Sequence, residues 1–274
     1  MRGSCRAEDG RDMKEQIIAR LRELEEKENI KILLAVESGS RAWGFESPDS
    51  DYDVRFIYVR DKDDYLCLEE PRDVIELPIE GDLDINGWDL RKALRLLYKC
   101  NPTLSEWLKS PIVYIESEYA DELRELPYEY FSRKGSLYHY LSMAQKTYRE
   151  HLTGDMVKVK KYFYALRPVL ACRWIIDRCV PPPMLFSKLV EAELPEELKE
   201  DVEKLLDIKM NSPETKLIPR VDKINEYLEK SMEGLKILAD EYPNEKRWYI
   251  DGLDAFFRMV LNGEKGCGRD YRYE

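Results

Sequence analysis

The stretch "ESGSRAWGFESPDSDYDVRFIYV", residues 37–59, decides the fold of this chain. Gly39 and Ser40 directly follow the apolar run at 30–38, and ten residues separate Ser40 from Asp51. Asp51 and Asp53 open a second run, rich in aromatic and β-branched residues, which predicts a strand over 50–59. Residues i and i+2 of a strand point to the same face, so the two carboxylates are predicted to lie side by side. Tyr52, between them, is predicted to face the other way.

The spacing of the two aspartates indicates phosphoryl-transfer chemistry. Two carboxylates side by side can bridge two divalent cations about 4 Å apart, which is the geometry of in-line transfer. A third carboxylate is then needed, and Asp84 in "DLDIN" is the candidate that we favour. Asp82, nearer a turn, and Asp89, which resembles a helix N-terminal residue, remain alternatives. Taken alone, an Asp-x-Asp pair could also be a solvated strand edge.

The Gly-Ser turn suits the phosphates of a nucleotide. Gly39 can adopt unusual dihedral angles and lets the backbone approach a ligand closely. The Ser40 hydroxyl and neighbouring backbone N–H groups could then hold the β- and γ-phosphates, and Arg41 would add positive charge. An ordinary turn is the alternative for Gly39 considered alone.

Further basic residues lie in "KVKKYFYALRPVLACRW" at 158–174. On a helix, Lys161, Tyr164 and Arg167 fall close to one face, where the two cations could bind the triphosphate and the tyrosine could stack on a base or ribose. Lys160 is an alternative to Lys161. The opposing interpretation is an amphipathic helix whose basic residues are solvated.

Composition limits the other possibilities. The net charge of −11 argues against an open, sequence-blind nucleic-acid-binding face, because such binding depends on neutralising phosphates. The chain has 2 histidines and 6 cysteines without a CxxC pair, which argues against zinc and for an oxygen-liganded ion such as Mg²⁺ or Mn²⁺. The sequence shows no apolar stretch of membrane-spanning length, so we expect no membrane partner and a cytoplasmic location.

Patterning along the chain predicts an α+β protein. A loose segment over 1–12 is expected to precede a mixed sheet-and-helix domain over 13–115, in which 73–79 and 82–87 form a hairpin. A helical domain is expected to follow over 116–274. Segments with helical periodicity are 12–28, 136–151, 156–178, 195–210, 219–242 and 247–262.

The combination of strand, Gly-Ser, ten residues, Asp-x-Asp on a second strand and a later Asp resembles the nucleotidyltransferase superfamily of DNA polymerase β. The closer likeness is to the predicted nucleotidyltransferases of its RNA-ligase-associated branch (RlaP-like, YcgL-like). Three stretches carry it: "SGSRAWGFESPDSDYDVRFIYV", "DLDINGWDLRKALRLLYKCNPTLSEWL" and "KKYFYALRPVLACRWI". The resemblance implies that Gly39 and Ser40 bind a triphosphate, and that Asp51, Asp53 and Asp84 hold two magnesium or manganese ions.

The function expected from these features is magnesium-dependent transfer of a nucleoside monophosphate from an NTP to an acceptor, with release of pyrophosphate. An RNA end is the favoured acceptor, because the branch is associated with RNA repair. The alternatives are a protein-nucleotidylating (AMPylating) enzyme of toxin–antitoxin type and a non-catalytic NTP-binding sensor or scaffold. Base preference, oligomeric state and the role of residues 184–274 are not readable from the sequence.

Overall fold

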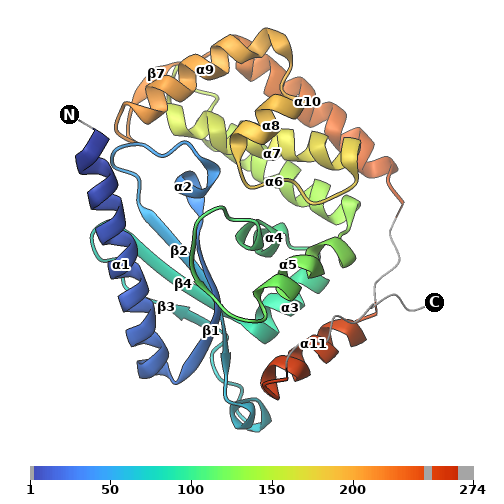
Figure 1. The fold of residues 1–274 in the computed structure, drawn as a ribbon. Helices are drawn as coiled ribbons and strands as arrows, with labels where there is room; N and C mark the ends of the chain where they lie inside the picture. The colour runs from blue at the N-terminus through green and yellow to red at the C-terminus, as the bar shows by residue number, and fades with distance from the viewer. Residues whose placement is uncertain (1–2, 244–248, 265–274) are drawn as a thin grey trace.

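The computed structural model describes residues 3–243 and 249–264. For residues 3–12 it describes the backbone only. It is a mixed α+β protein, as the sequence predicts (Figure 1). A five-stranded sheet, with helices on both faces, is followed by a bundle of helices that lies across one end of it.

The sheet has the strand order β3-β4-β2-β1-β5. Its strands are β1 (Ile30–Glu37), β2 (Tyr52–Arg60), β3 (Val74–Glu76), β4 (Leu83–Asp89) and β5 (Val113–Glu116). β2 and β4 are parallel, whereas the other neighbouring strands are antiparallel. The antiparallel pair β3–β4 confirms the hairpin expected around Glu80 and Gly81. The parallel pair sets the register of the candidate site.

One face of the sheet is covered by α1 (Gly3–Glu28). Its Ile17 and Leu21 are fully buried and belong to the same core as Val54 and Phe56 of β2. The helix begins at Gly3, inside the segment over residues 1–12 that the sequence predicts to be loose. No proline interrupts this segment, and a single glycine inside a helix costs only about 1 kcal/mol.

The opposite face is covered by four helices from distant parts of the chain. They are α3 (Leu90–Tyr98), α4 (Pro102–Leu108), α5 (Ala120–Glu129) and α11 (Asp251–Leu261). Leu123 of α5 and Phe256 of α11 are buried in one core with Leu33 and Ile57 of the sheet. Part of the region expected to form a separate helical domain therefore completes the core of the sheet.

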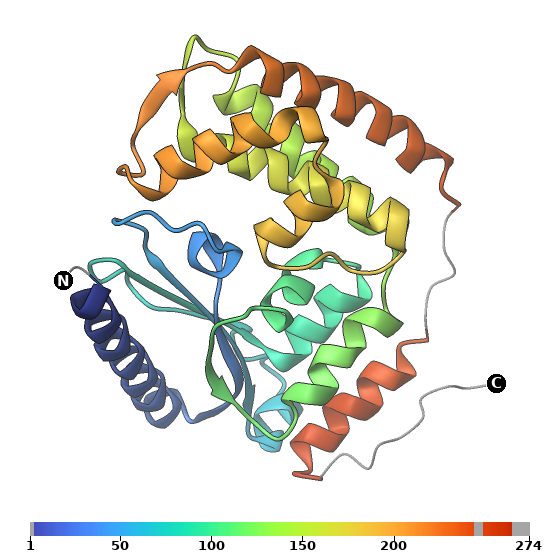
Figure 2. The same ribbon diagram turned by 45° about the horizontal axis from the view of Figure 1, so that its top comes forward.

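The remaining helices form the bundle: α6 (Arg133–His151), α7 (Val159–Arg178), α8 (Phe186–Glu193), α9 (Glu196–Met210) and α10 (Asp222–Glu241). A two-stranded sheet of β6 (Met156–Lys158) and β7 (Leu217–Pro219) joins two of its connections. In Figures 1 and 2 the bundle lies beside the short helix α2 (Gly39–Trp43), at the end of the sheet where β1 finishes and β2 starts. Within the described part of the chain, no helix combines the length and the apolar character that a bilayer crossing needs.

Candidate active site

The turn after β1 packs closely against the first residues of β2. Gly39 has φ +60°, and the N–H of Ser38 donates to the carbonyl oxygen of Asp53 at 2.8 Å. A Cβ atom added to Gly39 would lie 2.0 Å from Oδ2 of Asp53. Only glycine therefore allows the turn and this carboxylate to approach so closely, whatever binds there.

Asp53 and Asp84 lie side by side on parallel strands. They are direct partners in the β2–β4 register, and each points to the face opposite α1, because Val54 and Ile85 next to them pack on the α1 side. Arg55 bridges the two: its Nη2 lies 3.0 Å from Oδ1 of Asp53 and 2.7 Å from Oδ2 of Asp84. Burial raises the pKa of Asp53 against the opposing effect of Arg55, and the charges of Asp84, Asp51 and Glu214 raise it further.

The other acidic candidates occupy different surroundings. Asp51 is exposed just before β2, close enough for its charge to affect Asp53. Asp82 is exposed before β4, where its carbonyl oxygen accepts from the N–H of Tyr52 at 2.6 Å. Asp89 caps α3 by accepting from the N–H of Arg91 at 2.8 Å. Of the three candidates for the third carboxylate, the structure thus places Asp84 beside Asp53.

Glu37 supports this arrangement from inside the protein. Its buried carboxylate accepts the N–H of Asp53 at 2.7 Å and a short hydrogen bond from the Tyr114 hydroxyl. Burial raises its pKa to about 7, although both hydrogen bonds and the charge of Arg41 oppose that change. Glu37 therefore fixes the backbone at Asp53 and does not face solvent.

Ser40 and Arg41 hold the loop that leads into β2. The Ser40 hydroxyl donates to Oγ of Ser50 at 3.0 Å. Arg41 donates to the carbonyl oxygens of Ser50 at 2.7 Å and Asp51 at 3.1 Å, and its guanidinium lies 3.7 Å from the ring centroid of Tyr52. Tyr52 itself packs on the α1 side of the sheet, as expected from strand alternation.

Tyr164, one of the three residues expected on α7, lies near enough to the carboxylates for their charges to affect it. The charges of Glu214, Asp53 and Asp51, after the larger effect of burial, raise the pKa of Tyr164 to about 12. The Lys161 ammonium lies 5.4 Å from the centre of the Tyr164 ring. Lys160, the alternative to Lys161, forms an ion pair with Glu214 at 2.5 Å. The α7 helix therefore brings basic and aromatic groups to the candidate site.

Arg167 does not lie where the sequence predicts. Its side chain is 1% exposed, pairs with Glu106 at 2.8 Å, and stacks over Trp43 at 4.7 Å. Six residues along a helix amount to about 600° of rotation, so Arg167 lies roughly 120° around α7 from Lys161. This arginine belongs to the core between α7 and α4, and it is not available to a nucleotide.

The donor chemistry suits a hard divalent cation, since carboxylate oxygens are the ligands that magnesium prefers. In the part of the chain that the structure describes, however, no group of three or more acidic, histidine or cysteine side chains is arranged to hold a metal ion. Arg55 already forms an ion pair with each of Asp53 and Asp84. A cation binding to these two carboxylates would have to compete with that guanidinium.

Several residues of the site went unrecognised in the sequence. Arg55 lies two residues after Asp53, so the same strand alternation that predicts the carboxylate face also places Arg55 on it. Glu214 and the buried Lys209 are distant in sequence and lie in or beside a loop. Nothing in the local pattern distinguishes them from the many other charged residues of the chain.

Comparison with known proteins agrees with the resemblance seen in the sequence. Residues 13–259 match the family described as RlaP, "RNA repair pathway DNA polymerase beta family". The uncharacterized protein YcgL of Bacillus subtilis (strain 168) is 48% identical over 260 residues, which cover 94% of this chain and 99% of that protein. A crystal structure of a nucleotidyltransferase-like protein from Exiguobacterium sibiricum 255-15 is also similar, with 12% identity and a TM-score of 0.30, covering 94% of this chain and 82% of that one. With this identity and TM-score, the structural similarity carries no argument. The family match and the YcgL similarity show that this chain belongs to the RNA repair pathway DNA polymerase beta family, and the family makes it a nucleotidyltransferase.

Proposed function

We propose that this protein transfers a nucleoside monophosphate from an NTP to an acceptor hydroxyl in a magnesium-dependent reaction, with an RNA end as the favoured acceptor. The observation that carries the proposal is the pairing of Asp53 and Asp84 in register on parallel strands, directly against the Gly39 turn. This places two carboxylates next to a backbone turn that only glycine allows. Such a site can hold a cation beside a phosphate chain.

In this proposal each group has a defined task, and Asp84 has two. Asp51, Asp53 and Asp84 would hold magnesium, which would neutralise charge on the triphosphate and favour departure of pyrophosphate. The acceptor oxygen bonds to the α-phosphorus as the bond from that phosphorus to the bridging oxygen breaks, and Asp84 takes the hydroxyl proton. Ser40, Arg41 and Lys161 bind the phosphate oxygens, and Tyr164 stacks on the base or ribose. Positioning and charge stabilisation supply most of the rate.

The acceptor is chosen from the family rather than from the surface of the protein. The family description names RNA repair. The net charge of −11 keeps a protein side chain open as a second acceptor class, as in nucleotidylating enzymes of toxin–antitoxin type. A non-catalytic NTP sensor is less favoured, since the Gly-Ser turn and all three carboxylates are present in the chain.

The test is transfer of label from each α-phosphate-labelled NTP with magnesium, first to the protein alone and then to added total RNA. The Asp51→Asn/Asp53→Asn double variant should lose transfer completely. Asp121→Asn on α5, whose side chain is 95% exposed, is the matched control and should retain it. Label in RNA would identify the favoured acceptor, whereas label in the protein would identify the second. Full transfer by the double variant would overturn the site.

A further inference from the structure

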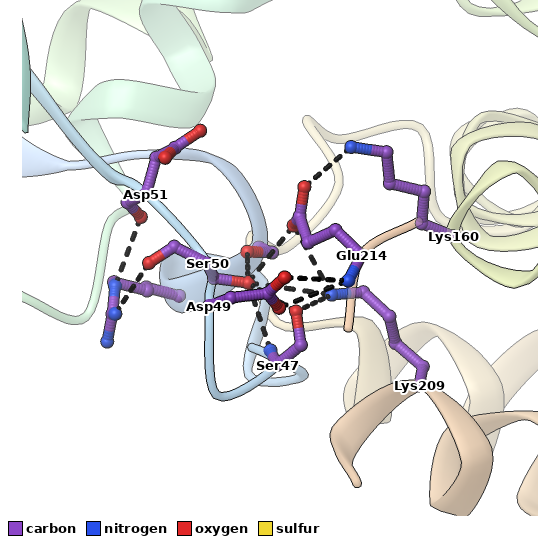
Figure 3. Close-up of polar contacts among 9 residues, drawn as sticks. Ser47, Asp49, Ser50, Asp51, Lys160, Lys209 and Glu214 are labelled. Atoms are coloured by element: carbon purple, nitrogen blue, oxygen red, sulfur yellow. Dashed lines mark hydrogen bonds and ion pairs between the residues drawn. The ribbon is translucent and has the colours of Figure 1, made fainter. Parts of the chain in front are cut away.

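A cluster of hydroxyl and ammonium groups fills the space between the loop after α2 and the loop after α9. Figure 3 shows Ser47 and Ser50 from the first loop, Glu214 from the second, Lys160 of α7 and Lys209 of α9. We call these five residues the Glu214 cluster. None of them belongs to the Asp53–Asp84–Arg55 group.

Glu214 is the only acidic side chain among these five, and three donors converge on it. Its Oε2 lies 2.5 Å from Nζ of Lys160, and its Oε1 lies 3.4 Å from Nζ of Lys209 and 3.1 Å from Oγ of Ser50. The two lysines and the serine hydroxyl lower the pKa of Glu214, although burial opposes them. The carboxylate is therefore held as an anion by cations from two helices.

Lys209 is an unusual residue to find in such a place. Its side chain is 2% exposed, and its Nζ also donates to Oγ of Ser47 at 2.7 Å. A buried ammonium is costly unless an anion and hydrogen-bond acceptors surround it. Glu214 supplies that anion, so the cluster requires a negative group at this point.

The cluster is continuous with the candidate active site. Ser50 accepts a hydrogen bond from Ser40 of the Gly-Ser turn at 3.0 Å. Glu214 also lies near enough to Asp53 and Tyr164 for its charge to raise the pKa of both, in each case after the effect of burial. A phosphate chain that begins at Asp53 and passes Ser40 would therefore reach the cations of the cluster.

We propose that Lys160, Lys209 and the hydroxyls of Ser47 and Ser50 form a polyphosphate subsite, in which the Glu214 carboxylate takes the place of a terminal phosphate until the nucleotide enters. These two ammonium groups and two hydroxyls are hydrogen-bond donors of the kind that bind phosphate oxygens. The carboxylate has the same sign of charge and occupies the same donors, so it must withdraw when phosphate binds. This inference rests on the proposed function, because it concerns the phosphate chain of the same nucleotide.

Withdrawal of Glu214 is possible because the residue lies in a loop. Its backbone N–H donates to both carboxylate oxygens of Asp49, at 3.0 and 3.1 Å, and these contacts are exposed. The loop between α9 and β7 spans residues 211–216. Exchange of one anion for another then costs little, since the buried ammonium keeps a negative partner throughout.

The experiment measures binding of inorganic tripolyphosphate to the full chain by calorimetry, without magnesium or acceptor. Glu214→Gln should bind tripolyphosphate at least about tenfold more tightly than the unmodified protein, because the competing negative charge is gone. Glu200→Gln on α9 removes the same charge from a side chain that is 80% exposed, and it should leave the affinity unchanged. Equal or weaker binding by Glu214→Gln, or no binding by either protein, would overturn the proposal.

A second pair of variants tests the buried cation. Lys209→Met should weaken tripolyphosphate binding at least about tenfold, whereas Lys204→Met, on an exposed face of the same helix, should not. Thermal unfolding of each variant shows whether it is folded. If Lys209→Met does not fold, the Glu214→Gln comparison decides alone, since that change keeps both lysines.

The two proposals fail in different ways. Tripolyphosphate binding needs neither a metal ion nor an acceptor, so it can be lost or retained independently of label transfer. Tighter binding by Glu214→Gln without any transfer would leave the subsite standing and the transferase reaction refuted. Transfer that depends on Asp53, with no effect of Glu214→Gln on tripolyphosphate, would do the opposite.

Discussion

At the scale of single residues, Gly39 is a position that tolerates little change. Its φ is +60°, and a Cβ atom would lie 2.0 Å from a carboxylate oxygen of Asp53. We expect Gly39→Ala to lower the free energy of unfolding by about 1–2 kcal/mol through the left-handed backbone. Nucleotidyl transfer should fall by at least about 100-fold, because Asp53 must move by an ångström or more. Thermal unfolding and label transfer measure the two effects.

Gly81 provides a matched control for that change. Its φ is +61°, but a Cβ atom there would meet nothing within 4 Å. Gly81→Ala should thus lose the same stability and keep full activity. Equal activity in both alanine variants would show that the contact between the turn and Asp53 is unimportant.

Arg55 is the second residue that merits a test. It forms ion pairs with Asp53 and Asp84, the carboxylates proposed to hold magnesium. We expect Arg55→Gln to tighten Mn²⁺ binding by about tenfold, because the ion no longer competes with a guanidinium. Electron paramagnetic resonance of free Mn²⁺ measures this affinity.

The control for Arg55 is Arg72→Gln, which removes an exposed arginine paired to Glu76 and should leave Mn²⁺ binding unchanged. Weaker Mn²⁺ binding in Arg55→Gln would mean that the arginine organises the carboxylates and does not compete with the ion. The residue would then be a positioning group of the site.

At the scale of elements, local sequence patterns predicted many helices and strands. They did not predict which strands lie side by side or which side chains meet. The alternation around Asp53 indicated β2 and a Tyr52 side chain that faces away from the carboxylates, and both are as expected. The parallel alignment of β2 with β4 brings Asp84 to Asp53, yet a strand pattern does not encode its neighbour. Helical spacing likewise suggested Arg167, but that side chain is buried and pairs with Glu106. Sequence reasoning thus predicted Asp53 and Asp84 but not Arg55, which forms ion pairs with both.

α11 illustrates an element whose packing could not be read from its sequence. The Phe256 side chain is 1% exposed and lies in the same core as Leu33 and Ile57 of the sheet. Those two residues are about 200 positions away along the chain. We expect Phe256→Ala to lower the free energy of unfolding by about 3–4 kcal/mol through the cavity it leaves. Denaturant unfolding followed by tryptophan fluorescence measures this, since Trp88 and Trp107 lie in or against that core.

Ile237→Ala, on α10, is the control for Phe256→Ala. The Ile237 side chain is 62% exposed, so its loss should change the free energy of unfolding by less than about 0.5 kcal/mol. If Phe256→Ala behaved like Ile237→Ala, α11 would contribute nothing to the sheet.

At the scale of the whole molecule, the sheet region and the bundle are joined by a half-buried lysine. Nζ of Lys109, at the end of α4, donates to the carbonyl oxygen of Pro181 at 2.8 Å, in the segment between α7 and α8. Its ammonium also lies 4.7 Å from the ring centroid of Tyr128. Burial lowers the pKa of Lys109 from 10.5 to about 8. The contact is therefore made by a cation that folding disfavours at neutral pH.

This depressed pKa predicts how stability depends on pH. Between pH 8 and pH 10.5 the unfolded chain keeps a proton on Lys109 that the folded chain has released, so the contribution of this residue to stability rises with pH. Across that window we expect the unmodified protein to gain about 2 kcal/mol relative to Lys109→Met, and below pH 8 the difference should be constant. Urea unfolding at a series of pH values measures the difference, with Lys99→Met, an exposed lysine after α3, as the control that should show no trend. A difference between Lys109→Met and the unmodified protein that stays flat from pH 7 to pH 10.5 would mean that the ammonium is solvated, and that α4 does not bury a charge against the bundle.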